Sequence, residues 1–212
     1  MVVGVDIAAG AWAVVLLEGD RIAEASRCQS FAEALAVNGD VVGVDIPIGF
    51  PETGVRPADL AARRFVGPRA SSVFPMAIRP VLEAASYADA RQLATELTGK
   101  SISAQAYALA KRILEVDEYA FVDERVIEVH PEVSFRELAR RPLASKHTRT
   151  GLVERRALLE QAGIEVPTAA RKVAEVDLLD ATVVAWSARR YARGQALPLP
   201  EEHRERIGAI WR

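Results

Sequence analysis

Two acidic residues occupy the same position in a repeated hexapeptide, Val-Val-Gly-Val-Asp-Ile. Asp6 belongs to the copy that begins at Val2, and Asp45 belongs to the copy that begins at Val41. Each copy is a short apolar run followed by a turn, which is typical of a buried strand. One Asp at a strand end is usually a turn former, but the repetition favours a shared site. If the strands are parallel neighbours, both carboxylates meet at the carboxyl edge of the sheet, where open α/β sheets bind ligands.

A second pair of acids begins the last long helical segment, "EVDLLDATVVAWSA". Asp177 and Asp180 are three residues apart, so they share one helix face, which continues with the apolar residues Ala181, Val184 and Ala188. Favourable interaction with the helix N-terminus accounts for one of these acids, at about 0.3–1 kcal/mol. We therefore expect the pair to point toward the edge of the sheet that carries the other acids.

A third group of polar residues lies in the segment "VIEVHPE". Glu128, His130 and Glu132 share one face while the backbone remains extended. We expect Glu128 to join the acidic site and His130 to contact substrate, although a solvent-facing strand edge explains His130 equally well. Glu132 is better explained as an ordinary acid in the first turn of a helix.

Carboxylate oxygens from several elements suit a hard divalent cation, Mg²⁺ or Mn²⁺. Zinc would be expected to recruit more His or Cys, and the chain has three His and one Cys, Cys28. Two such ions about 3.5–4 Å apart can activate water and stabilise the leaving oxygen of a phosphodiester. The acids therefore predict a metal site for phosphodiester chemistry.

The elements that position these acids follow an α/β pattern. Three strands joined by short turns predict an antiparallel meander, and a helix then leads to the second hexapeptide as a parallel strand. A mainly helical insertion with one irregular loop precedes a fifth strand, and three helices follow it. We predict a single domain over residues 1–212, with strands at 2–7, 12–17, 21–27, from 41 and 125–130, helices at 30–37, from 131, 150–163 and 175–193, an insertion at about 51–120 and its loop at 67–80.

Composition excludes several classes of protein. The chain has 212 residues, half of them hydrophobic, which suffices for one packed core, and a formal net charge of −2, which excludes a polycation that coats nucleic acid. Basic residues concentrate at 53–80 and 136–156, which could form a positive rim or an ordinary solvated surface. With one cysteine there is no internal disulfide, and the absence of a leader or membrane span predicts a soluble cytoplasmic protein.

Seven motifs, in order, resemble the DUF429 family, described as predicted nucleases of the ribonuclease H-like fold. They are "GVDIA", "VDIPIGFP", "GPRASSVFP", "SAQAYALAKRILEVD", "EVHPEVSF", "SKHTRTGLVERRALL" and "DLLDATVVAW". The resemblance implies a ribonuclease H-like five-stranded mixed sheet flanked by helices, with a helical insertion between strands 4 and 5. It also implies metal-binding carboxylates at Asp6, Asp45 and the Asp177/Asp180 pair, and places Glu128 in a family motif. Ribonuclease H has a Glu on its first helix, where this chain offers Glu33 without other signs of a site.

Several polar residues are candidates for binding a phosphate-containing substrate. Two serines between arginines, in the loop at 67–80, match the family motif and can bind phosphate oxygens, or can order the loop's own carbonyl groups. Gln105 and Lys111 lie in one helical segment, and Lys146 lies in the basic segment, where each is either a substrate contact or a solvated residue. The predicted substrate-binding residues are Arg69, Ser71, Ser72, Arg79, Gln105, Lys111, His130 and Lys146.

The sequence as a whole favours a hydrolase, a nuclease that uses Mg²⁺ or Mn²⁺ to cleave phosphodiester bonds of DNA, RNA or a smaller phosphoester. The metal ligands and catalytic residues would be Asp6, Asp45, Glu128, Asp177 and Asp180. One alternative is an actin-like ATPase or kinase, although 212 residues leave no room for its second domain. Another is a non-catalytic nucleic-acid-binding module, which unneutralised carboxylates disfavour because they repel phosphate.

Overall fold

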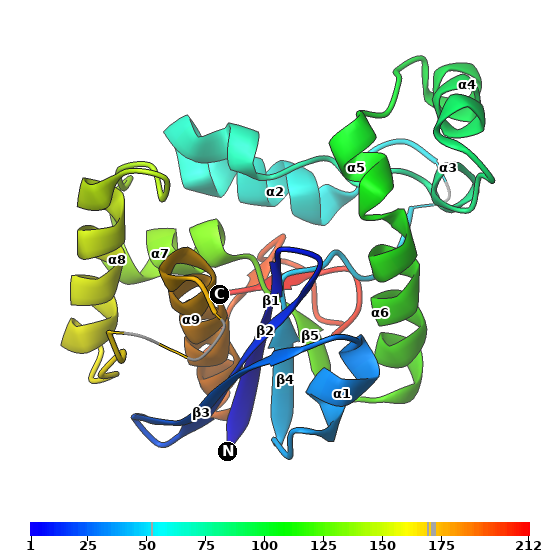
Figure 1. The fold of residues 1–212 in the computed structure, drawn as a ribbon. Helices are drawn as coiled ribbons and strands as arrows, with labels where there is room; N and C mark the ends of the chain where they lie inside the picture. The colour runs from blue at the N-terminus through cyan, green and yellow to red at the C-terminus, as the bar shows by residue number, and fades with distance from the viewer. Residues whose placement is uncertain (52, 169, 171–172) are drawn as a thin grey trace.

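The computed structural model describes residues 1–51, 53–168, 170 and 173–212, with a mixed sheet at its centre (Figure 1). The strand order is β3-β2-β1-β4-β5. The first three strands pair antiparallel, and β1, β4 and β5 pair parallel. The predicted meander followed by two parallel strands is therefore confirmed. The strands are β1 (Val2–Ala8), β2 (Ala11–Glu18), β3 (Arg21–Cys28), β4 (Val41–Val44) and β5 (Val126–Glu128).

Helices cover both faces of the sheet, as strands that are apolar on both sides require. On one face lie α7 (Pro131–Ala139), α8 (Arg149–Gln161) and α9 (Glu175–Ala192). On the other face lie α1 (Phe31–Ala36) and α6 (Ala110–Val122). This arrangement, with its five-stranded mixed sheet, is an α/β fold and is consistent with the ribonuclease H-like fold.

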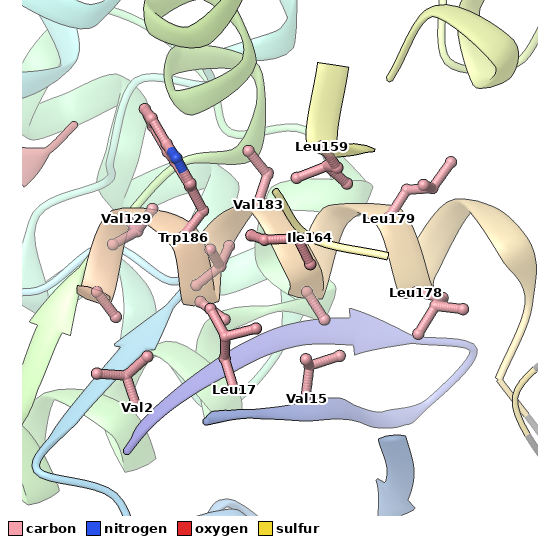
Figure 2. Packing of buried hydrophobic residues seen from close by; sticks show 14 of the residues in the cluster. Val2, Val15, Leu17, Val129, Leu159, Ile164, Leu178, Leu179, Val183 and Trp186 are labelled. Carbon is pink, nitrogen blue, oxygen red and sulfur yellow. The ribbon is translucent and has the colours of Figure 1, made fainter. Parts of the chain in front are cut away.

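The larger core lies between α9 and the first two strands (Figure 2). Val2, Val15 and Leu17 project from the sheet toward the helix, and Leu178 of the helix points back toward the sheet. All four side chains are at most 5% exposed. Each fully buried side chain of this size contributes about 1.5–3 kcal/mol relative to an exposed one. This packing fixes the position of α9 relative to β1.

The insertion between β4 and β5 is helical, as predicted, and apart from α6 it lies at the end of the sheet at which β1 and β4 terminate (Figure 1). The segment at 67–80 is less irregular than expected, because residues 67–72 form a short 3-10 helix, η1. Gly67, at φ 61°, ends the preceding helix and allows this change of direction. The elements are α2 (Pro57–Val66), η1 (Gly67–Ser72), α3 (Arg79–Leu82), α4 (Tyr87–Thr98), α5 (Ala104–Ala108) and α6.

Near the C-terminus, β6 (Pro198–Leu199) and β7 (Ile210–Trp211) pair antiparallel in a separate two-stranded sheet. The sequence does not predict them, because two-residue strands carry no periodic pattern. Across the described ranges, no helix is both long enough and apolar enough to cross a membrane.

Candidate functional site

The two acids of the repeated hexapeptide lie side by side. Asp6 is in β1, and Asp45 directly follows β4, the parallel neighbour of β1. The backbone N–H of Asp45 donates to the carbonyl oxygen of Val5 over 2.9 Å, so the strand pairing continues into the site. The charge of Asp45 is also among the causes that raise the pKa of Asp6, after burial, so the two carboxyl groups are close. The structure therefore brings Asp6 and Asp45 together at the carboxyl edge of the sheet.

Helix α9 contributes a third acid because it approaches β1 unusually closely. A Cβ atom on Gly4 would lie 2.1 Å from the carbonyl oxygen of Ala181 and 2.4 Å from the amide nitrogen of Ala185. Only glycine allows this contact, which leaves Asp180 buried near Asp6. Asp177 lies one turn earlier, is partly exposed and faces the cavity described below.

Lys146 provides the cation of this acidic cluster. It lies between α7 and α8, and its Nζ atom is 2.6 Å from Oδ2 of Asp180. Burial of the ammonium group opposes its charge, but attraction to Asp180, Asp6 and Asp45 outweighs this effect and raises the pKa of Lys146. One lysine therefore faces three carboxyl groups that come from separate elements.

Contacts from Arg155 and Gly151 hold the segment that carries Lys146 in place. The buried guanidinium of Arg155 donates to the carbonyl oxygen of Ala144 over 2.8 Å and to Oε2 of Glu132 over 2.8 Å. Gly151 permits a close approach to the same segment, since a Cβ there would lie 2.1 Å from the carbonyl oxygen of Ser145. Sequence reasoning missed Arg155, because a buried arginine in a basic segment resembles its solvated neighbours.

The acids are incompletely neutralised. Burial, followed by the charges of Asp45 and Asp180, raises the pKa of Asp6 well above its ordinary value of 3.8. Burial also raises the pKa of Asp180, against the opposing effect of Lys146. Oδ1 of Asp180 is buried and receives no hydrogen bond from the residues that the structure describes. A cluster of this kind requires a bound proton or a further cation.

The donor set fits a hard divalent cation, because it consists of carboxylate oxygens, one of them buried and without a hydrogen bond from any described residue. In the part of the chain that the structure describes, however, no group of three or more His, Cys, Asp or Glu residues has a geometry ready to hold a metal ion. Lys146 already occupies Oδ2 of Asp180. A metal ion at Oδ2 would have to displace the ammonium group, whereas Oδ1 receives no hydrogen bond from the described residues.

Glu128 lies in a different environment from the other predicted ligands. Its two oxygens each accept a hydrogen bond of 2.6 Å from Arg56, and the backbone N–H of Ile48 donates to Oε2 over 2.8 Å. Arg56 also bonds to Asp59, and all three charged side chains are at most 4% exposed. The arginine and the amide thus satisfy both oxygens of Glu128, which sets it apart from the acids around Lys146.

The motif "VHPE" forms the adjacent wall. Nδ1 of His130 accepts a hydrogen bond from the backbone N–H of Glu132 over 3.2 Å, and its Nε2 lies 3.3 Å from the carbonyl oxygen of Ser72. The carboxylate of Glu132 binds Arg155 and lies 3.2 Å from Nε of Arg69. Glu132 is thus an internal counter-ion as well as a first-turn acid, and His130 joins η1 to α7.

These walls enclose a cavity of about 540 Å³ between the sheet edge and the insertion. Most of the predicted residues line it, whereas Asp180 is buried behind the wall. Arg79 instead binds Asp117 over 2.7 Å and stacks on the ring of Phe50, and Lys111 is exposed on α6; neither is among the described residues that line the cavity. The predicted residues on the wall are Asp6, Asp45, Asp177, Glu128, Arg69, Ser71, Ser72, Gln105, His130 and Lys146.

The cavity also has lining residues that sequence reasoning did not select. His147 follows Lys146 directly, and its position beside a predicted substrate-binding lysine was the available signal. Arg56 precedes Pro57, the first residue of α2, and carries no sequence signal of its own, because its partner Glu128 lies 72 residues away.

Comparisons with known proteins place the chain in a family without an established activity. No curated protein and no solved structure matches it. One family model does match, over residues 4–205, and its description reads "Protein of unknown function (DUF429)". Since the match covers nearly the whole chain, this protein belongs to the DUF429 family.

Proposed function

We propose that this protein is a metal-dependent hydrolase that cleaves phosphodiester bonds of nucleic acid, with Mg²⁺ or Mn²⁺ bound by Asp6, Asp45 and Asp180. The observation that carries the proposal is the meeting of these three carboxyl groups, from β1, the end of β4 and α9, around one lysine at the wall of a cavity. Asp177, on the cavity wall, is the fourth candidate ligand.

A divalent cation at this site would activate water and stabilise the charge that develops on phosphate oxygens. The protein's own residues would bind and orient the substrate. Arg69, which is partly exposed on the cavity wall, can donate to phosphate oxygens, and Ser71 lies on the same wall. Lys146, released from Asp180, can attract the phosphate or donate a proton to the leaving oxygen.

The buried groups would keep this arrangement rigid. Arg56 fixes Glu128 and Asp59 on one side, and Arg155 fixes Glu132 on the other. Pre-organised groups lose little free energy to reorganisation when charge develops during the reaction. Glu128 and Glu132 are therefore positioning residues in this proposal.

The test combines metal binding with hydrolysis. Calorimetric titration with Mn²⁺ and hydrolysis of bis(p-nitrophenyl) phosphate are measured for the wild type and for the Asp6→Asn/Asp45→Asn double variant. We expect the double variant to retain its fold and to lose both signals. Asp40→Asn is the matched control, because Asp40 is exposed and pairs with the N-terminal amine, and this variant should retain both.

Three results would contradict the proposal. The first is robust hydrolysis by the folded double variant. The second is turnover of ATP without cleavage of any phosphodiester, which would favour a kinase-like protein. The third is metal-independent binding of nucleic acid without turnover, which would favour a binding module.

A further inference from the structure

Apolar side chains make up part of the lining of the cavity. Its lining there comes mainly from the insertion, with one contribution from the residue after Asp45. Most of these side chains are less than 10% exposed and thus surround the cavity rather than face open solvent. The residues are Ile46, Met76, Leu82, Ile102, Leu109 and Ile113, which we call the apolar compartment.

The walls of the compartment are tied to the rest of the fold by buried charges. Oδ2 of Asp59 accepts a hydrogen bond of 2.7 Å from the backbone N–H of Met76. Oδ1 of Asp117 accepts one of 2.8 Å from Gly49, and its Oδ2 pairs with Arg79. Protein interiors are normally close-packed, so a cavity of this size with an apolar lining indicates a binding function.

Polar and charged side chains line another part of the same cavity. Lys146, His147 and Arg69 line it together with Asp6 and Asp45. A ligand that fills the cavity would therefore have one anionic, metal-binding part and one apolar or planar part. A nucleotide unit has both parts, because its phosphate is an anion and its base has an apolar face.

The size of the cavity limits what can enter it. Its volume of about 540 Å³ lies within the range of about 300–1,000 Å³ that is usual for sites of small molecules. A base that is paired inside a duplex must leave the stack to reach such a cavity, at a cost of a few kcal/mol that an unpaired base avoids. On the rim, the ring of Phe74 is 61% exposed and available for stacking.

Building on the function proposed above, we infer that the substrate presents a single unpaired nucleotide, with its base in the apolar compartment and its phosphate at Asp6 and Asp45. The nucleotide belongs either to a dinucleotide or to the end of a single strand. The site therefore selects single-stranded nucleic acid over duplex.

The experiment compares four substrates in Mn²⁺: a dinucleotide, a single-stranded 12-mer, the blunt duplex of the same sequence, and methyl p-nitrophenyl phosphate. We expect the single strand to be cleaved at least about tenfold faster than the duplex. The relative cleavage rates of the dinucleotide and the 12-mer identify which of the two is the better source of the bound nucleotide. Equal cleavage of duplex and single strand would overturn the inference.

Two variants on α5 test the compartment itself. Ala106 lines the cavity, whereas Ala108 is exposed on the same helix and is not among the described lining residues. We expect Ala106→Trp to slow cleavage of the single strand about tenfold more than that of methyl p-nitrophenyl phosphate. The matched control Ala108→Trp should leave both rates unchanged. Equal effects of Ala106→Trp on both substrates would overturn the inference.

Phe74→Ala, on the exposed rim, provides a variant that leaves the core intact, and it should weaken binding of the dinucleotide about tenfold. Failure of the two proposals can be told apart. If the wild type hydrolyses none of the substrates, the proposed function fails. The nucleotide site is then tested by titration of the dinucleotide into wild type, Ala106→Trp and Phe74→Ala. Equal affinities for the three proteins, or no binding to any of them, would refute the inference.

Discussion

The Nζ atom of Lys146 lies 2.6 Å from Oδ2 of Asp180, and this ion pair joins the α7–α8 connection to the helix that covers the sheet. The lysine also attracts Asp6 and Asp45. In the structure, the ammonium group of Lys146 thus neutralises part of the negative charge that a metal ion would neutralise in the proposed function.

The first prediction concerns Lys146→Gln without metal. Three carboxyl groups lose their shared cation, so we expect the free energy of unfolding to fall by about 2 kcal/mol, less than for a fully buried pair because Lys146 is 34% exposed. Urea denaturation at neutral pH measures this change.

The same variant should bind Mn²⁺ more tightly in calorimetric titration, because the ion no longer competes with the ammonium group. Mn²⁺ should also raise the melting temperature of Lys146→Gln more than that of the wild type. Unchanged or weaker Mn²⁺ binding would show that the lysine does not occupy the cation position.

The second prediction concerns pH. The pKa of Asp6 is raised in the folded chain by burial and by Asp45 and Asp180, so the folded chain binds this proton more tightly than the unfolded chain. The free energy of unfolding contributed by Asp6 is therefore greatest below the ordinary value of 3.8 and falls as pH rises through the higher folded pKa.

Chemical denaturation of the metal-free protein across this pH range measures the effect. Asp6→Asn carries no titrating proton, so its stability should decline less steeply and should equal or exceed that of the wild type at neutral pH. An unchanged slope in Asp6→Asn would assign the pH dependence to other groups.

The third prediction separates the role of Glu128 from that of the proposed metal ligands. Arg56→Ala leaves Glu128 and Asp59 buried without their cation, and removal of one partner from a buried pair costs about 3–5 kcal/mol. Thermal unfolding measures the loss. Glu128→Gln should likewise lower stability, while the folded fraction keeps its Mn²⁺ affinity.

A surface pair provides the control for this comparison. Arg21 and Glu18 form an ion pair at 2.6 Å but are 70% and 53% exposed. Arg21→Ala should change stability by less than about 1 kcal/mol.

The Mn²⁺ affinity of Glu128→Gln tests the other half of the prediction. If this variant is folded but binds no Mn²⁺, Glu128 is a metal ligand.

The fourth prediction concerns the contact that positions Asp180. Gly4→Ala places a methyl group 2.1 Å from the carbonyl oxygen of Ala181, which forces α9 away from β1. We expect a loss of at least about 2 kcal/mol in the free energy of unfolding, together with weaker Mn²⁺ binding. Wild-type stability and Mn²⁺ affinity would show that the helix adapts without moving the acid.

The sequence by itself determined the elements whose patterns are local. The repeated hexapeptide predicts two buried strands with acids at equivalent positions, and strand pairing does bring Asp6 and Asp45 together. The spacing of Asp177 and Asp180 predicts a helix face directed at the sheet, and α9 packs there. Such patterns repeat every few residues, so they can be recognised without the rest of the chain.

Only the tertiary structure decided which charges meet. Lys146 and Asp180 are 34 residues apart, and Arg56 and Glu128 are 72 apart. A single arginine or lysine has no periodicity, and its long side chain is equally compatible with solvent or with a buried partner. Asp180 therefore pairs with a lysine and Glu128 with an arginine because of the way in which the insertion and α9 pack against the sheet.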